Sequence, residues 1–224
     1  MHSEQESTKQ LRQPPIPEPT LRRLPLYLAY LKQQDHGEDN NISCTNIAQA
    51  LNLIPIQVRK DLAYTGIVGR PKTGYNAAKL RTSIENFLGW DNRSDALLFG
   101  AGHLGLALLS YAGFSDYGIN IVAAVDSDPA KAGQTINGKK IIPLHKAASL
   151  ITRLHIHIGI LAVPAQAAQE TADMIVKAGI RAIWNFAPVK VTVPPDVILQ
   201  HENLASSLAV LSKKLALSVA GKQI

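Results

Sequence analysis

Apolar residues recur at helical spacing through the first part of the chain. The leucines of the first such segment stand three and four residues apart, at Leu21, Leu24, Leu28 and Leu31. This spacing predicts a helix over residues 20–34, because positions three and four apart share one helical face. The polar, proline-rich residues 1–19 before it predict a disordered tail.

Two further helices and a hairpin follow. Ser43 can cap a helix whose apolar face carries Ile47 and Leu51, and Pro55 suits the first position of the next helix. Two short helices around a tight turn fit a helix-turn-helix. A hairpin is then marked by three glycines: Gly66, Gly69 and Gly74.

A last helix completes this part of the chain. Asn76 can cap it, and it ends at Gly89, a residue type that favours helix C-termini. The order helix, helix-turn-helix, basic hairpin and helix is typical of a winged helix-turn-helix. We therefore expect such a domain over residues 20–89.

After residue 90 the pattern changes to short apolar runs that alternate with helical segments. The predicted strands are 96–100, 120–125, 140–144, 157–163 and 181–186, with a helix at 165–179 before the last. Continuous apolar strands between helices predict a parallel sheet covered on both faces, and so an α/β domain over residues 90–202.

The C-terminal segment, residues 203–224, carries one more helix, predicted from Asn203 to about Val219. Its leucines form a stripe at helical spacing: Leu204, Leu208, Leu211 and Leu215. The stripe must be buried either in the same subunit or in a partner.

Positive charge is concentrated in the helix-turn-helix region. The chain has 23 Lys and Arg against 17 Asp and Glu, a formal charge of +6. Residues 56–81 contain six basic residues and one acid, Asp61. Such clustering is the electrostatic footprint of a protein that binds phosphate backbones, although a solvated face gives the same pattern.

The remaining composition indicates a soluble, cytoplasmic protein. A hydrophobic fraction of 46% with 18% charged residues is ample for a packed core. The single cysteine, Cys44, cannot form an intramolecular disulfide. No segment reads as a membrane span or a signal peptide.

A glycine-rich turn follows the first predicted strand. It reads Gly100-Ala101-Gly102-His103-Leu104-Gly105, and Asp126 ends the next strand 21 residues later. Strand, turn, helix and acid together form the Rossmann-like dinucleotide fingerprint. The acid can accept from both ribose hydroxyls and would repel a 2′-phosphate. Because Ser127 and Asp128 follow it rather than an arginine, NAD (NAD+ or NADH) is favoured over NADP.

The residues do not favour an enzyme. Tyr75 and Lys79 stand four apart, as a catalytic pair would, but they precede the predicted cofactor domain. His155 and His157 lack an evident carboxylate partner, and no Cys, His or Asp cluster has metal-ligand spacing. We expect neither catalytic residues nor a metal site.

The motifs together resemble a known family. QVRKDLAY (57–64), a glycine-flanked basic wing ending in GY, GAGHLG, VDSDPAKAG (125–133), LAVPAQAAQ (161–169) and NFAPV (185–189) resemble the Rex redox-sensing transcriptional repressors of bacteria. The resemblance runs from about Leu21 to Leu217. It implies a homodimer that exchanges its C-terminal helices, binds NAD and releases a palindromic DNA operator when NADH binds.

The resemblance also assigns roles to residues. It implies contacts to DNA from Gln57, Arg59, Lys60, Tyr64, Arg70, Lys72 and Tyr75. It implies cofactor contacts from the glycine-rich turn 100–105, Asp126, Lys131, Tyr111, Pro164, Asn185, Phe186, Ala187 and Pro188.

The chain departs from the family pattern at three positions. Ala29 stands where members usually have an arginine, and Asn203 and Ser207 stand where they usually have acids. Loss of both members of a charged pair can be nearly neutral, whereas loss of one typically costs about 3–5 kcal/mol. We therefore expect a repressor with a weakened or altered response to NADH.

Three other functions stay open on the sequence. The first is an NAD-dependent enzyme with an accessory basic domain. The second is a coenzyme A-binding module, because residues 161–179 resemble the coenzyme A-binding domain of acyl-CoA synthetases. The third is a DNA-binding protein without a ligand response. The operator, the regulated genes and the preference between NADH and NAD+ are not given by the sequence.

Overall fold

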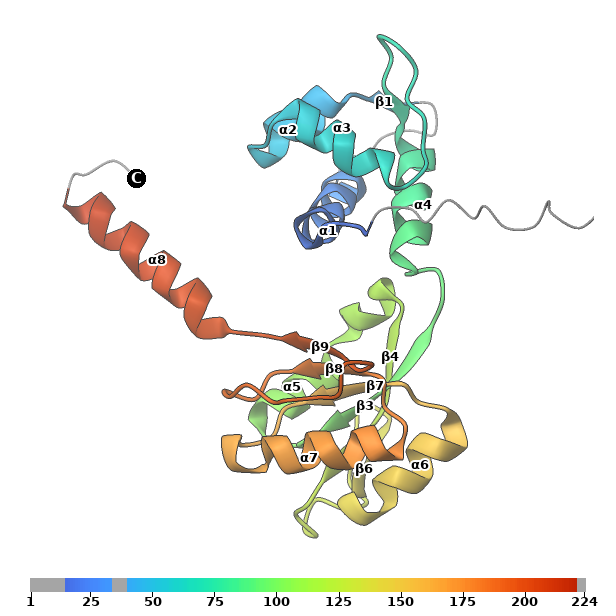
Figure 1. The fold of residues 1–224 in the computed structure, drawn as a ribbon, viewed down its shortest axis with the longest axis vertical. Coiled ribbons are helices and arrows are strands. Elements are labelled where there is room, and N and C mark those ends of the chain that lie inside the picture. Colours follow the sequence, from blue (N-terminus) through green and yellow to red (C-terminus); the bar gives the residue numbers. More distant parts are fainter. Residues whose placement is uncertain (1–14, 34–39, 221–224) are drawn as a thin grey trace, which may run out of the picture. The chain divides into compact units, whose positions relative to one another are not determined.

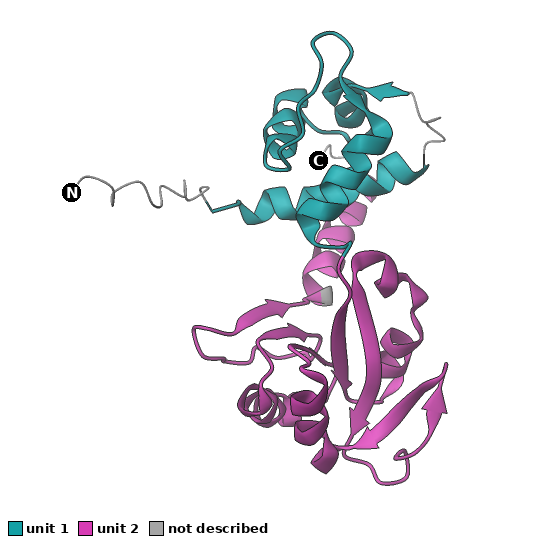
Figure 2. Cartoon of the chain, turned by 90° about the vertical axis from the view of Figure 1, so that its right-hand side faces the viewer, with its two compact units in different colours: residues 1–91 teal, residues 92–224 magenta. Residues whose placement is uncertain are grey.

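The structure, a computed structural model, describes residues 15–33 and 40–220 and divides the chain into two compact units. Unit 1 comprises residues 1–91 and unit 2 residues 92–224 (Figure 2). Most of the predicted tail 1–19 lies outside the described residues. Glu18 and Pro19, assigned to the tail from the sequence, belong instead to the first helix.

Unit 1 is a small helical domain with a two-stranded sheet (Figure 1). Its elements are α1 (Glu18–Gln33), β1 (Asn41–Ile42), α2 (Cys44–Leu51), α3 (Pro55–Ala63), β2 (Tyr75–Asn76) and α4 (Ala77–Leu88). One apolar cluster joins the four helices, with Leu24, Ile47, Val58, Leu62 and Leu80 fully buried.

Local signals in the sequence set the ends of these helices. Ser43 and Asn46 form a capping box at the start of α2, and Asn76 caps α4. Asn52 ends α2 in a left-handed conformation with φ 53°, which leaves room for the turn before Pro55 at the start of α3. Gly89 ends α4 at φ 70°, as predicted.

The wing is a tight hairpin between Arg70 and Gly74. The Arg70 N–H donates to the Gly74 carbonyl at 2.7 Å, and the Gly74 N–H donates back to Arg70 at 2.9 Å. Gly74 has φ 86°, and a Cβ there would lie 2.3 Å from the Ile42 carbonyl oxygen. Only glycine therefore allows β2 to pair with β1, a pairing that the sequence analysis did not predict.

Unit 2 is a seven-stranded sheet with helices on both faces. Its elements are β3 (Ser94–Phe99), α5 (His103–Ser110), η1 (Ala112–Tyr117), β4 (Ile119–Asp126), β5 (Thr135–Ile136), β6 (Lys139–Pro143), η2 (Leu144–Lys146), α6 (Ala147–Leu154), β7 (Ile158–Leu161), α7 (Ala165–Ala178), β8 (Ala182–Asn185), β9 (Ile198–His201) and α8 (Leu204–Val219).

The strand order is β5-β6-β4-β3-β7-β8-β9. All neighbouring pairs are parallel except β5 and β6, so the sheet is mixed rather than wholly parallel as predicted. Strands β5 and β9 were not predicted from the sequence. β5 has two residues, and β9 is an edge strand whose burial alternates, so neither presents a continuous apolar run.

Alternate residues of β3 supply two cores. Leu97 and Phe99 pack with α6 and α7 on one face of the sheet. Ala96 and Leu98 pack with α5 and η1 on the other. The carboxyl ends of β3 and β4 are thereby held rigidly at one edge, where a doubly wound sheet binds its ligands.

Helix α8 leaves its apolar stripe uncovered in the single chain. Leu208 is 61% exposed, Leu211 63% and Leu215 62%. An apolar face of this extent on one helix is typical of a surface that packs against a partner. Among the described residues, no helix combines the length and apolarity that crossing a membrane would require.

Candidate functional site

The turn after β3 can be made only with glycine at two positions. Gly100 has φ 98°, and a Cβ on it would lie 2.4 Å from the Ala162 carbonyl oxygen. A Cβ on Gly105 would lie 1.8 Å from the Gly100 carbonyl oxygen, so α5 could not approach the turn. Gly102 caps α5 with open space beside its Cα and no side-chain cap. The first N–H groups of α5 are therefore available to an anion.

A cleft of about 810 Å³ opens beside this turn. Predicted cofactor residues on its wall are Gly100, Gly102, His103, Leu104, Asp126, Lys131, Pro164, Phe186 and Pro188. Segments from the ends of β3, β4, β7 and β8 thus meet at one site, although they are far apart in the sequence. The volume lies within the range of about 300–1,000 Å³ that small-molecule sites occupy.

Asp126 is the fixed acceptor of the cleft. Its Oδ2 accepts from the Ala101 N–H at 2.7 Å and from Lys131 Nζ at 3.1 Å, and its Oδ1 accepts from the Asp128 N–H at 2.8 Å. Burial raises the pKa of this carboxyl, but the three donors outweigh it and hold the pKa below its ordinary value. The group is an anion at neutral pH and can accept from hydroxyl groups.

Five predicted cofactor residues lie outside the wall of the cleft: Ala101, Gly105, Tyr111, Asn185 and Ala187. Ala101 and Gly105 act through the backbone of the turn. Asn185 is fully buried, and its Oδ1 accepts from the Ala187 N–H at 2.9 Å. Asn185 therefore does not line the cleft but holds the loop at 185–189 in place through this buried hydrogen bond.

Tyr111 is half exposed and packs against Phe114. It begins a chain of rings that runs from Phe114 to Trp184 and ends at Phe186 on the cleft wall, with centroid separations of 5.0, 5.7 and 4.6 Å. Tyr111 is thus linked to the cleft through aromatic packing, although it does not line it.

Helix α7 supplies a part of the cleft wall that was not predicted from the sequence: Ala167, Glu170, Thr171 and Met174. These positions stand three and four residues apart and so share one helical face. The signal was present in the spacing, but only the sheet topology shows that this face lies across from Gly100.

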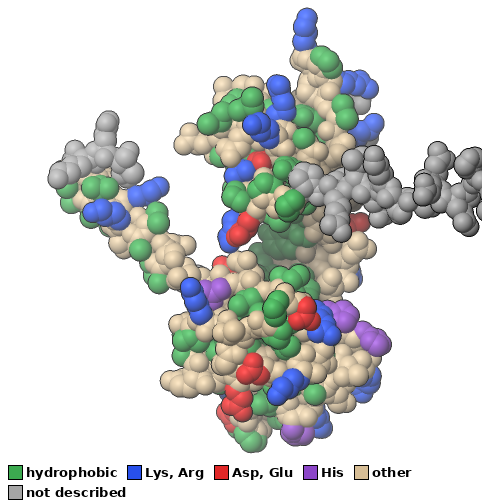
Figure 3. All heavy atoms as spheres, viewed as in Figure 1, with side chains coloured by type: hydrophobic (Ala, Val, Ile, Leu, Met, Phe, Trp, Pro, Cys, Tyr) green, Lys and Arg blue, Asp and Glu red, His purple; other side chains and the backbone are tan. Residues whose placement is uncertain are grey.

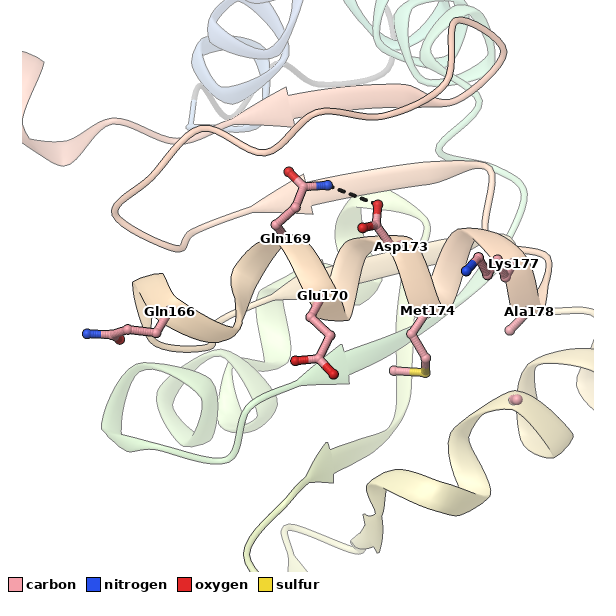
Figure 4. Close-up of a pocket in the computed structure, with 8 residues that line it drawn as sticks. Gln166, Gln169, Glu170, Asp173, Met174, Lys177 and Ala178 are labelled. Carbon is pink, nitrogen blue, oxygen red and sulfur yellow. Dashed lines mark hydrogen bonds between the residues drawn. The ribbon is translucent and has the colours of Figure 1, made fainter.

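A second hollow of about 760 Å³ lies along the outer side of α7 (Figure 4). Gln169 donates to Asp173 at 2.9 Å and is also tied to the backbone of Thr192, while Glu170 and Met174 point to the other side of the helix. The hollow has neither a glycine turn nor a free helix N-terminus. Within the described part of the chain, no three His, Cys, Asp or Glu residues are placed to hold a metal.

Unit 1 carries a basic hollow of about 440 Å³ between α3 and the wing. It brings together four of the predicted DNA-contacting residues: Arg59, Arg70, Lys72 and Tyr75. Ser43 and Cys44, at the start of α2, line the same hollow. A helix N-terminus beside three cations suits a phosphate group. In the space-filling view, Lys and Arg side chains are prominent over this unit (Figure 3).

The other three predicted DNA residues lie on or after α3. Lys60 is exposed, and Tyr64 is half-buried at the end of the helix. Gln57 faces α1: with its amide oxygen toward the guanidinium of Arg23, it accepts from Nη1 at 3.2 Å and Nη2 at 3.3 Å.

A buried ionic cluster fixes α3 against α1. Asp61 is 2% exposed and accepts from Arg23 at 2.6 and 2.8 Å, from Tyr27 at 2.6 Å and from Thr20 at 2.9 Å. Burial raises the pKa of Asp61, but these donors outweigh it and bring the pKa below its ordinary value. In the sequence, Asp61 stands out only as the one acid among the basic residues 56–81. Its structural role follows from the contact between α3 and α1, which the sequence does not show.

A winged helix that offers cations to phosphates, joined to a nucleotide-binding sheet with a fixed carboxylate, defines a DNA-binding regulator that responds to a nucleotide. Family models match both units: residues 15–63 match a putative DNA-binding protein N-terminus, and residues 91–189 match a CoA binding domain.

Curated relatives give the same result over most of the chain. The redox-sensing transcriptional repressor Rex of Treponema denticola is 48% identical over 193 residues, covering 86% of this chain and 92% of that protein. The Rex of Bacteroides fragilis is 41% identical, covering 89% and 91%. The chain belongs to the Rex family of redox-sensing transcriptional repressors. Its relatives are named repressors, not enzymes.

Solved structures agree. A crystal structure of RSP, a Rex-family repressor, in complex with NAD+ and operator DNA has a TM-score of 0.84 and 33% identity, and covers 95% of this chain and all of that one. RSP in complex with NADH has a TM-score of 0.83, covering 93% and 98%. The winged-helix and Rossmann-like assignments made from the sequence are confirmed.

Proposed function

We propose that this protein is a cytoplasmic, homodimeric repressor that binds a palindromic DNA operator and releases it when NADH occupies the cleft of unit 2. The observation that carries the proposal is the geometry of the glycine turn and Asp126: an open helix N-terminus lies beside a carboxylate that is an anion at neutral pH. That pair fits the pyrophosphate and the ribose of a dinucleotide.

Each end of the cleft has a separate task. The N–H groups of residues 102–104 would hold the pyrophosphate, and Asp126 with Lys131 would hold the adenosine ribose. Pro164, Phe186 and Pro188 supply apolar parts of the cleft wall and would receive the nicotinamide. When bound, the dinucleotide supplies a ring whose charge and shape differ between its two oxidation states.

The basic hollow of unit 1 supplies the affinity for DNA. Arg59, Arg70 and Lys72 can neutralise phosphates on either side of a groove entered by α3. Relatives of known structure support this role, because RSP is found in complex with operator DNA.

The exposed stripe of α8 supports the dimer. Leu208, Leu211 and Leu215 would be covered if each subunit packed its helix against the other. A two-fold dimer presents two copies of α3, which read a palindrome when they lie about 34–36 Å apart. A ligand that prefers a different spacing of the two copies weakens DNA binding by shifting that equilibrium.

The response to NADH is expected to be weakened or altered in this chain. Ala29 is exposed on α1 and carries no charge. Asn203 accepts from the Ser206 N–H at 3.2 Å and so serves as the cap of α8, without the charge of an aspartate. An ionic link between these positions is therefore excluded, and coupling must use other contacts.

The direct test is the affinity of the purified protein for an operator palindrome in the presence of NAD+, NADH or neither. We expect tight binding without NADH and weaker binding with it. Equal affinity in all three conditions would contradict the proposal.

A second ligand is favoured by one observation, the match of residues 91–189 to a CoA binding domain. Asp126 argues against it, because a carboxylate suits free ribose hydroxyls and repels the ribose phosphate of coenzyme A. Competition between NADH and coenzyme A for the cleft decides between them, and we expect NADH to bind more tightly.

A further inference from the structure

The ends of β8 and β9 are joined by side chains on both faces of the sheet. On one face, the indole Nε1 of Trp184 donates to Glu202 Oε1 at 2.8 Å. On the other face, the amide of Asn185 contacts His201 Nδ1 at 3.0 Å. The Glu202 N–H also donates to the Asn185 carbonyl at 2.9 Å. Helix α8 begins at Leu204, two residues after Glu202, so these bonds hold the segment that leads into it.

The two faces differ in rigidity. Asn185 is fully buried, and its Oδ1 accepts from the Ala187 N–H, so its Nδ2 must donate both to the Val189 carbonyl at 2.8 Å and to His201. His201 accordingly accepts at Nδ1 and carries its proton on Nε2. The side-chain amide of Asn185 thus uses its oxygen and both of its N–H groups in bonds to the loop and to β9. We therefore expect this face of the sheet to be rigid.

The face of the sheet that carries Trp184 is linked to the cleft through Phe186. The Trp184 ring packs against Phe186 at a centroid distance of 4.6 Å and against Phe114 at 5.7 Å. Phe186 lines the cleft, and Trp184 is only partly buried. A displacement of Phe186 therefore acts directly on a ring whose N–H is bonded to the segment that leads into α8.

We propose that Trp184 and Glu202 are positioning residues that transmit occupancy of the cleft to helix α8. This inference rests on the proposed function and names its route of regulation. The indole turns about two side-chain torsions only, and its partner is a carboxylate, which gives a stronger bond than a neutral acceptor. If Phe186 moves, either Glu202 and the first residues of α8 move with it, or the hydrogen bond between Trp184 and Glu202 breaks.

Two substitutions remove the bond while leaving an apolar side chain at each position. Trp184→Phe keeps an aromatic ring without the N–H, and Glu202→Met keeps the length of the side chain without the acceptor. Glu202→Gln retains an oxygen acceptor and serves as the conservative rescue. The quantity measured is the factor by which saturating NADH weakens operator binding. We expect Trp184→Phe and Glu202→Met to reduce this factor by about fivefold, and Glu202→Gln to keep it.

A double variant shows whether Trp184 and Glu202 act through their shared bond or have two independent effects on the NADH response. If the bond carries the response, Trp184→Phe with Glu202→Met lowers the factor no further than either change alone. Asp196→Asn is the control, since it removes the exposed ion pair with Arg181 at 3.5 Å beside the start of β9, away from α8. We expect the control to keep the full NADH effect.

The fluorescence of Trp184 gives a second measurement. Its response to NADH would not depend on Glu202 if the bond between the two residues were purely structural. The chain has two tryptophans, so Trp90→Phe leaves Trp184 as the single emitter. We expect NADH to shift the emission maximum of that protein, and the shift to be lost when Glu202→Met is added, with NADH affinity by calorimetry within about twofold of the parent.

The outcomes separate this inference from the proposed function. If calorimetry and operator release by NADH are normal in the parent, and Trp184→Phe and Glu202→Met release the operator as fully as the parent, the proposed route is wrong and the repressor function stands. If the parent itself neither binds NADH nor releases DNA, the proposed function fails.

Discussion

The carboxylate of Asp126 accepts a hydrogen bond of 2.7 Å from the backbone N–H of Ala101. The bond joins the end of β4 to the glycine turn after β3, so the open start of α5 and the carboxylate that we propose as the ribose acceptor are held together. Preorganisation of this kind lowers the cost of ordering a site when its ligand binds.

Substitutions at two glycines of the turn distinguish an effect on folding from an effect on NADH binding. Gly105→Ala places a Cβ 1.8 Å from the Gly100 carbonyl oxygen, so we expect unit 2 to lose stability. Gly102→Ala meets nothing within 4 Å, so the fold should persist, while the added methyl group occupies space needed by the pyrophosphate. We expect Gly102→Ala to lose about tenfold or more in NADH affinity with an unchanged melting temperature. Full NADH affinity in Gly102→Ala would show that the nucleotide lies elsewhere.

We expect the choice between NADH and NADPH to depend on Asp126. Asp126→Asn removes the negative charge while Lys131, 3.1 Å away, remains. We expect the ratio of NADPH affinity to NADH affinity to rise by about tenfold or more. Asp116→Asn is the control, because Asp116 is an exposed carboxylate on η1 that does not line the cleft. Calorimetry with both nucleotides measures the ratios, and the prediction fails if Asp126→Asn and Asp116→Asn behave alike.

We expect the wing to contribute a contact to a DNA phosphate. Lys72 adopts φ 64°, a conformation that glycine tolerates well, so Lys72→Gly removes the charge without straining the turn. We expect weaker operator binding and a logarithmic salt dependence that is shallower by about one unit. Arg153→Ala, an exposed cation in unit 2, should leave both quantities unchanged. An unaltered salt slope in Lys72→Gly would remove the wing from the interface.

The buried cluster of Asp61 stabilises unit 1. Asp61→Asn leaves Arg23, 19% exposed, without its counter-ion, and we expect a loss of about 3 kcal/mol in unfolding free energy. Glu18→Gln breaks the Arg22–Glu18 pair, whose side chains are 62% and 69% exposed, and should cost far less. Denaturant unfolding compares them, and equal losses would contradict a structural role for the cluster.

The same carboxyl makes stability depend on pH. The folded-state pKa of Asp61 lies below the ordinary value of 3.8, so its contribution is complete above that value. The contribution is lost as the pH falls through the folded-state pKa. The unfolding free energy of the parent should therefore fall more steeply in acid than that of Asp61→Asn, and parallel curves would refute the assignment.

The apolar stripe of α8 should be a subunit interface. Leu211→Asp places a charge where the side chain is 63% exposed in the single chain, and we expect it to dissociate the dimer. Lys213→Asp changes the opposite face of the same helix and should leave the dimer intact. Sedimentation velocity separates the two results, and a stable Leu211→Asp dimer would place the interface elsewhere.

Much of the architecture could be predicted because it is set locally. Capping residues such as Ser43, Asn76 and Gly89 mark helix ends in the chain itself, and the structure places those ends as expected. The glycine turn and Asp126 were predictable for a related reason: close backbone approach requires glycine wherever it occurs.

What the sequence did not predict depends on contacts between distant segments. β9 became a strand because it pairs with β8, not because its residues alternate strongly. The wall supplied by Thr171 and Met174, and the bond between Trp184 and Glu202, arise from the order of strands in the sheet. No short-range pattern encodes that order.

The central claim is that NADH in the cleft of unit 2 lowers the affinity of unit 1 for DNA. Fluorescence anisotropy of a labelled operator palindrome, titrated with the protein in saturating NAD+ and then in saturating NADH, tests it most directly. We expect a higher dissociation constant for the operator in NADH than in NAD+. Identical dissociation constants for the parent in both nucleotides would contradict it.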